Sequence, residues 1–212
     1  MRIRYYGHSC FELKFTGGVS ILTDPFDETV GYDMPSPAVD IVSISHNHYD
    51  HNYTGSIRGE YRLVNKAGDF RISGINITGV PSFHDKFRGA KRGSNIIFTF
   101  DDGSVRVCHL GDLGHLLSDG QLRRIGRADV LLIPVGGFYT IDWSDAVKVV
   151  GQINPSVVIP MHYKTDAVTM PIDTAGPFIK GIGGAQRIGS REIEIDSRML
   201  RLKKMAYVLE YK

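Results

Sequence analysis

Cysteine is scarce in this sequence. Only Cys10 and Cys108 occur among the 212 residues, and they lie too far apart to form a C-x-x-C pair. Neither a disulfide framework nor a cysteine-rich zinc ribbon is therefore available to the chain. Two buried, reduced thiols are expected, which fits a cytoplasmic protein.

Long apolar runs and blocks of like charge are also missing. The chain has no apolar stretch of about 18 residues, and its N-terminal residues lack the apolar segment of a secretory signal. Its 25 Lys and Arg nearly balance its 23 Asp and Glu. Because no block of about five like charges stands out, the charge pattern gives no sign of a nucleic-acid surface. We expect a small-molecule substrate as the partner, no nucleic acid and no membrane, with a homo-oligomer left open.

What the sequence does have is the composition of a globular domain. Hydrophobic residues make up 42% of the chain and charged residues 23%, and no repeat or linker interrupts it. A chain of this length buries enough surface for one stable core. We therefore expect a single domain over residues 1–212.

Short β-rich runs separated by turn residues dominate the first half of the chain. Gly17-Gly18 and Asp102-Gly103 each lie between two alternating segments, which predicts two hairpins. Two almost wholly apolar runs follow at 130–135 and 157–160, and they predict strands buried on both faces. The other expected strands cover 2–6, 10–15, 19–23, 40–45, 70–78, 95–100 and 105–110.

Helical signals are fewer and come mostly late in the chain. We expect helices just after His51 and over residues 118–125, 144–153 and 173–179. In the third of these, Ser144 is the expected N-cap, and Ala146, Val149 and Val150 recur at helical spacing. The mixture excludes a purely antiparallel β-fold and predicts an α+β fold of two mixed sheets covered by helices.

The densest chemical signal is His46-Asn47-His48-Tyr49-Asp50-His51, which follows the apolar run 41–44. Alternate side chains of an extended chain share a face, so His46 and His48 point the same way and can bind one ion. Asp50 and His51 lie one step into the following turn, where they can face a second ion. The alternative is a loop of hydrogen-bonded polar residues, but imidazoles crowded this closely repel one another when protonated, and a divalent cation is the usual reason to assemble them.

The pattern H-x-H-x-D-H at a strand end resembles the signature of the metallo-β-lactamase superfamily. His84, Asp112 and His162 follow in the order that this family requires. The resemblance implies an αββα sandwich and two divalent ions, zinc by default, with manganese, iron or nickel as alternatives. The ligands that it implies are His46, His48 and His84 for one ion, Asp50, His51 and His162 for the other, and Asp112 between them.

Further motifs resemble a small prokaryotic branch of zinc-dependent hydrolases related to L-ascorbate-6-phosphate lactonase and N-acyl phosphatidylethanolamine phospholipase D. Many true β-lactamases of this fold carry cysteine where Asp112 stands, which argues against antibiotic hydrolysis as the native role. No substrate is carried over from these relatives. The motifs are Gly7-His8-Ser9, Thr23-Asp24-Pro25, His84-Asp85, Arg92-Gly93-Ser94-Asn95, Gly111-Asp112-Leu113-Gly114 and Pro134-Val135-Gly136-Gly137.

Four further residues are candidates for supporting roles. Asp24 is expected to accept a hydrogen bond from a metal-bound histidine, with a simple turn before Pro25 as the alternative. His8 can reach the cleft, although a hydrogen-bonded structural histidine is the more ordinary interpretation. His115 is the best candidate for a substrate contact. Arg92, in the basic segment 86–92, can bind phosphate or carboxylate on a substrate, or belong to a solvated loop.

Together these residues predict a metal-dependent hydrolase. A hydroxide bridged between two ions would cleave an ester, lactone or phosphodiester bond in a small substrate, and an anionic substrate would suit the basic segment. Asp50, which would orient the hydroxide or pass a proton, and Asp112, between the ions, are the expected catalytic residues. A nuclease or RNA-processing relative and a non-catalytic metal-binding protein of the same fold are the alternatives. A flavodiiron-type redox enzyme would need a carboxylate where His48 stands.

Overall fold

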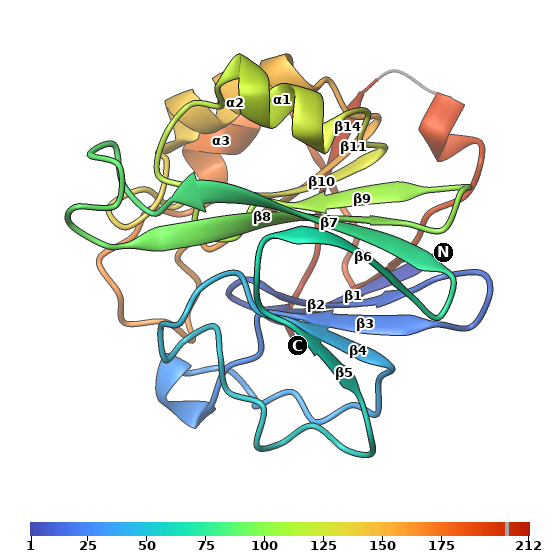
Figure 1. Ribbon diagram of the computed structural model, residues 1–212. Coiled ribbons are helices and arrows are strands. Elements are labelled where there is room, and N and C mark those ends of the chain that lie inside the picture. Colours follow the sequence, from blue (N-terminus) through green and yellow to red (C-terminus); the bar gives the residue numbers. More distant parts are fainter. Residues whose placement is uncertain (202–203) are drawn as a thin grey trace.

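The computed structural model describes residues 1–201 and 204–212. Two β-sheets lie face to face, and the α-helices of the described residues cover the outer face of one of them (Figure 1). The α+β class and the two mixed sheets expected from the sequence are confirmed. Among the described residues, none of the helices combines the length and hydropathy needed to cross a bilayer.

The first sheet has six strands in the order β13-β1-β2-β3-β4-β5. Strands β1, β2 and β3 pair antiparallel, whereas β3, β4 and β5 pair parallel, so the sheet is mixed. The hairpin expected at Gly17-Gly18 joins β2 to β3. The strands are β1 Arg2–Gly7, β2 Cys10–Lys14, β3 Ser20–Thr23, β4 Ile41–Ser43, β5 Arg62–Val64 and β13 Glu192–Glu194.

The second sheet has eight strands in the order β12-β14-β11-β10-β9-β8-β7-β6. Its β6 to β9 half is antiparallel, with the expected Asp102-Gly103 hairpin between β8 and β9, and its β9 to β12 half is parallel. The strands are β6 Gly68–Ile72, β7 Ile75–Phe83, β8 Ser94–Asp101, β9 Arg106–His109, β10 Val130–Pro134, β11 Val157–Met161, β12 Gln186–Arg187 and β14 Met205–Val208.

Apolar side chains fill three layers. Between the sheets, Phe11 of β2 and Phe98 of β8 belong to one large buried cluster. On the outer face of the eight-stranded sheet, α1 Asp119–Ile125, α2 Trp143–Ile153 and α3 Gly176–Gly181 bury side chains such as Val149 against strands β8 to β11. On the outer face of the six-stranded sheet, Phe26 and Val30 bury the strands beneath a loop that contains the short 3-10 helix η1 Glu28–Val30. A second short 3-10 helix, η2 Met199–Arg201, lies near the C-terminus.

Two of the expected elements are wrong. No helix follows His51, because residues 52–61 form a loop in which Tyr53 N–H donates to the Pro25 carbonyl and glycine occurs at Gly55 and Gly59. The expected single strand 70–78 is instead the hairpin of β6 and β7. It turns at Ser73-Gly74, where both residues have positive φ.

Helix starts and the C-terminal strands also differ from expectation. Helix α2 begins at Trp143, and its N-cap is Asp142 rather than Ser144, since the Asp142 carboxylate accepts the N–H groups of Ser144 and Asp145. Helix α3 begins three residues later than expected, with proline in its first turn. Strands β12, β13 and β14 are short, and the sequence pattern did not reveal them.

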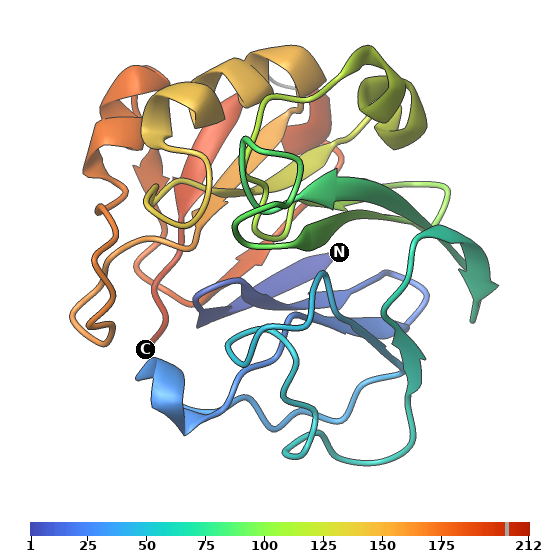
Figure 2. The same ribbon diagram turned by 60° about the vertical axis from the view of Figure 1, so that its left-hand side comes forward.

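Four loops that follow β4, β7, β9 and β11 leave the sandwich at one edge. This edge is on the left of Figure 1 and comes forward in Figure 2. Parallel strands end at a common edge, and the two antiparallel pairings between β7 and β9 give these strands the same direction. The fold therefore delivers the residues that follow these four strands to one place.

Candidate metal centre

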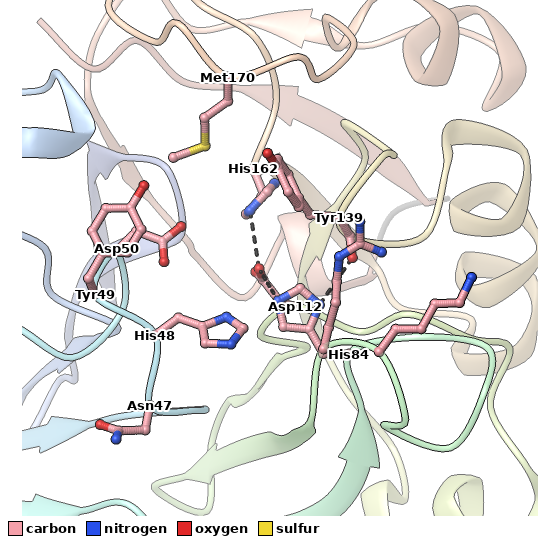
Figure 3. Close-up of a pocket in the computed structure, with 11 residues that line it drawn as sticks. Asn47, His48, Tyr49, Asp50, His84, Asp112, Tyr139, His162 and Met170 are labelled. Atoms are coloured by element: carbon pink, nitrogen blue, oxygen red, sulfur yellow. Dashed lines mark hydrogen bonds and ion pairs between the residues drawn. The ribbon is translucent and has the colours of Figure 1, made fainter.

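Seven polar side chains from the four loops meet at this edge. Figure 3 shows five of them, His48, Asp50, His84, Asp112 and His162, pointing toward one another. The nearest ligand atoms of His46, His48 and His84 lie within 4.8 Å of one another, and so do those of Asp50, His51, His162 and His8. We call the seven the His/Asp cluster: His46, His48, Asp50, His51, His84, Asp112 and His162. The structure thus brings together all the residues expected as metal ligands.

Asp112 lies at the middle of the cluster. Its Oδ2 is 3.0 Å from His84 Nε2, 3.2 Å from His162 Nε2 and 3.3 Å from His51 Nε2. Burial favours the neutral acid, but the neighbouring imidazoles His162 and His51 outweigh it and hold the pKa of Asp112 well below its usual range. The cluster therefore holds a buried, ionised carboxylate that imidazoles surround.

Three of the histidines have their outer ring nitrogen tied to the protein. His84 Nδ1 donates to the Tyr139 carbonyl at 3.0 Å, and because a carbonyl only accepts, its Nε2 is left without a proton in the neutral ring. His51 Nδ1 lies 3.0 Å from Asp24 Oδ2, and His46 Nδ1 lies 2.9 Å from Ser45 Oγ. These partners fix the ring orientations, so that the Nε2 atoms of His51 and His84 face Asp112.

Asp24 occupies the position that its expected role requires. Besides His51, its carboxylate accepts the Ser45 N–H at 2.7 Å and the Ser45 hydroxyl at 2.6 Å. Burial would raise the pKa of Asp24, but the bond from His51 and nearby imidazoles lower it overall, so the group stays ionised. The carboxylate therefore links the strand end that carries His46 to the ring of His51.

His8 is buried beside the cluster. Its Nε2 lies 3.1 Å from Asp50 Oδ2, and its ring centre is 4.2 Å from that of His162. Burial, helped by the neighbouring His162 imidazole, lowers the pKa of His8 to about 4, so the ring is neutral at pH 7. In that state His8 Nε2–H donates a hydrogen bond to the ionised Asp50. His8 is therefore a hydrogen-bonded structural histidine that also contacts the site.

His115 and His109 are not brought into the site. His115 Nε2 accepts the Phe83 N–H and its Nδ1 donates to the Leu116 carbonyl, and the ring lines a separate surface hollow. The expected substrate contact through His115 is therefore not supported by its position. His109 is fully buried and bonded to the Ser9 carbonyl.

A cavity of about 470 Å³ opens above the cluster. His48, Asp50, His84, Asp112 and His162 form its floor, as Figure 3 shows. Its other lining residues include Tyr49, Tyr139 and Met170, together with the basic residues Lys91 and Arg92. The size suits a small molecule.

The sequence patterns did not identify two residues that shape the floor. Asn95 of β8 accepts the Asp112 N–H through Oδ1 and donates through Nδ2 to the Leu110 carbonyl, so it fixes the loop after β9. Gly114 packs so closely that a side chain there would overlap the backbone of His84 and Asp85. Both occur in motifs that the family resemblance pointed to, but their contacts depend on the fold.

Many of the buried polar atoms that lack a hydrogen-bond partner lie in or beside the His/Asp cluster. Among the described residues, eight buried side-chain nitrogen or oxygen atoms have no hydrogen bond, and five belong to the cluster and His8. These include His46 Nε2, His51 Nε2 and Asp112 Oδ1. Each buried atom without a partner costs about 1–3 kcal/mol. Imidazole and carboxylate are the donors that zinc and similar divalent ions take, so the residues fit a metal centre.

Several known proteins resemble this chain in sequence and in fold. The β-lactamase superfamily domain matches residues 2–162. A UPF0173 protein of Pyrococcus abyssi is 34% identical over 188 residues, and a UPF0173 metal-dependent hydrolase of Thermoplasma acidophilum is 28% identical over 191; each match covers 78% of this chain and 84% of the relative. A solved Thermotoga maritima structure, named as a Zn-dependent hydrolase of the metallo-β-lactamase superfamily, has a TM-score of 0.84 and 36% identity and covers 98% of this chain and 97% of that one. The resemblance inferred from the motifs is confirmed.

Proposed function

Because the chain belongs to the family of the β-lactamase superfamily domain, we propose that it cleaves an ester, lactone or phosphodiester bond with two divalent ions, zinc by default. Its similarity to these relatives identifies the chain as a metal-dependent hydrolase of the metallo-β-lactamase superfamily. The two ions and the bond types are our proposal. It is carried by the convergence of the His/Asp cluster at one edge of the sandwich, where buried imidazole and carboxylate atoms lack hydrogen-bond partners.

The chain offers a ligand set for each ion. His46, His48 and His84 would hold one ion, because their ring nitrogens already lie close together. Asp50, His51 and His162 would hold the other. The Asp112 carboxylate contacts rings from both sets, which supports placing it between the ions.

Bound divalent ions would lower the pKa of a coordinated water from 15.7 to about 7 and polarise the oxygen of the scissile bond. Water would be the attacking group, and in keeping with this the cavity lining contains no serine, threonine or cysteine among the described residues. Asp50 lines the cavity and is ionised, since the imidazoles of His51 and His8 overcome the effect of burial and lower its pKa. Its carboxylate, held by His8, would orient that water or take its proton.

The test combines metal content with turnover. Metal per chain is measured by plasma mass spectrometry on wild type, Asp112→Ala and His84→Ala, and the same samples are assayed with a nitrophenyl phosphodiester and a lactone. His115→Gln is the matched control, because this histidine lies outside the cavity.

We expect about two ions in wild type and in His115→Gln, and turnover lost in both cluster variants by roughly 100-fold or more. A wild type that binds no metal and shows no turnover, even with added zinc or manganese, would contradict the proposal and favour a protein of this fold without catalytic function.

A further inference from the structure

A single carboxylate organises the loop between β7 and β8. Asp85 is buried and accepts four backbone N–H groups, from Phe87 and Gly89 at Oδ1 and from Lys91 and Arg92 at Oδ2, at 2.7–3.0 Å. The loop is therefore wrapped around one buried carboxylate, and the backbone at Arg92 is held in place before any ligand arrives.

Aromatic rings also hold the side chain of Arg92. Its guanidinium carbon lies 5.1 Å from the ring centre of Tyr139 and 5.9 Å from that of Phe138. A cation–π contact of this kind uses none of the guanidinium N–H groups as hydrogen-bond donors, so they stay free to bind an anion. Within residues 1–201 and 204–212, no carboxylate pairs with Arg92, whereas Lys86 of the same loop is bound to Asp145 at 2.8 Å.

Tyr139 connects this cation to the metal centre. Its ring contacts the Arg92 guanidinium, and its carbonyl accepts the hydrogen bond from His84 Nδ1. Tyr139 thus sets the position of the Arg92 guanidinium relative to His84, a member of the His/Asp cluster. Arg92 lines the cavity above the cluster, and so does Lys91, whose ammonium lies 4.2 Å from the ring centre of Phe87.

From this arrangement we propose that Arg92, assisted by Lys91, binds a carboxylate or phosphate group of the substrate, remote from the bond that is cleaved. The inference rests on the proposed function, because it takes the cavity over the cluster as the substrate site. Tyr49, Tyr139 and Met170 line the same cavity, so the part of the substrate between its anionic group and the scissile bond is apolar. The substrate class is therefore a small organic anion with a hydrolysable bond at its other end.

The experiment measures binding and needs no turnover. Zinc-loaded wild type and variants are titrated by calorimetry with pentanoate, glutarate and phosphonobutyrate, which share a chain length and one carboxylate. Glutarate adds a second carboxylate and phosphonobutyrate adds a phosphonate, so the two compounds separate the possible anions. The variants are Arg92→Gln and the matched control Arg88→Gln, whose arginine lies on the same loop but lines a different hollow.

We expect wild type and Arg88→Gln to bind at least one of the two dianions about fivefold or more tightly than pentanoate, and Arg92→Gln to lose that preference. Arg92→Met, which keeps an apolar contact with Tyr139, replaces the glutamine variant if that one does not fold. Equal preference in Arg92→Gln and wild type, or no preference in wild type, would overturn the proposal. If the variants keep the expected difference in dianion binding but the wild type shows no turnover, the proposed hydrolase function fails and the proposed anion site at Arg92 stands.

Discussion

At the residue scale, Asp24 lies outside the His/Asp cluster and positions one of its rings. It is buried and ionised, and it fixes the Nδ1 side of His51. Asp24→Asn keeps the shape but offers one acceptor oxygen instead of two. We expect the metal affinity of the zinc-loaded protein to fall about 10- to 100-fold, as is typical when the partner of a ligating histidine is changed. Competition with a chromogenic chelator measures the change.

The chain offers a close control for this variant. Asp40 also accepts a serine N–H and the hydroxyl of the same serine, Ser20, but it lies outside the metal centre. Asp40→Asn should leave the zinc affinity unchanged. If both variants lose affinity alike, Asp24 acts only through general stability.

The grouping of the His/Asp cluster could be predicted from the sequence because its chemistry is crowded into few positions. Four of them lie within six residues, and any fold that ends a strand there keeps them close. The charge of the basic segment alone does not distinguish Arg92, the candidate named from the sequence, from Arg88. Both belong to one basic segment, and only the wrapping of the loop around Asp85 decides which one lines the cavity.

At the scale of elements, the loops after β7 and β9 depend on close backbone contact. A Cβ at Gly114 would overlap the backbone of His84 and Asp85. We therefore expect Gly114→Ala to lower the free energy of unfolding by about 1–3 kcal/mol and to reduce metal content, because His84 must shift. Chemical denaturation and metal analysis of the same samples check both effects.

Gly120→Ala is the matched control for Gly114→Ala, because the space around Gly120 is open. It lies in α1, where an added Cβ meets nothing closer than 3.9 Å, so Gly120→Ala should leave metal content unchanged and raise stability by up to about 1 kcal/mol. If Gly114→Ala matches Gly120→Ala in stability and in metal content, the loops after β7 and β9 do not depend on the close backbone contact at Gly114.

Local patterns predicted the long elements and failed on short ones. The apolar runs of β10 and β11 and the capped helix α1 carry strong signals of their own. Strand β12 has two residues and β13 three, too few for a period to be visible, and their partners are distant in sequence. Such strands form because an existing sheet edge offers hydrogen bonds, which no local pattern encodes.

At the scale of the whole molecule, the His/Asp cluster joins the two sheets. Its residues after β4 come from the six-stranded sheet, and those after β7, β9 and β11 come from the eight-stranded sheet. Metal bound between them should stabilise the fold by about 3–4 kcal/mol per ion when its concentration is 100 to 1,000 times its Kd. For a chain of this size, removal of both ions by chelation should lower Tm by roughly 20 °C, measured by thermal unfolding.

His84→Ala serves as the comparison for chelation. This variant loses a ligand of one proposed ion, so its Tm should respond less to chelator than that of wild type. An unchanged wild-type Tm after the metal has been shown to leave would mean that the ions do not join the sheets.

The most direct test of the proposed centre is anomalous diffraction at the zinc edge from crystals of the zinc-loaded protein. The account predicts two peaks, one among His46, His48 and His84 and the other among Asp50, His51 and His162, with the Asp112 carboxylate between them. A single peak, or peaks away from this cluster, would contradict it.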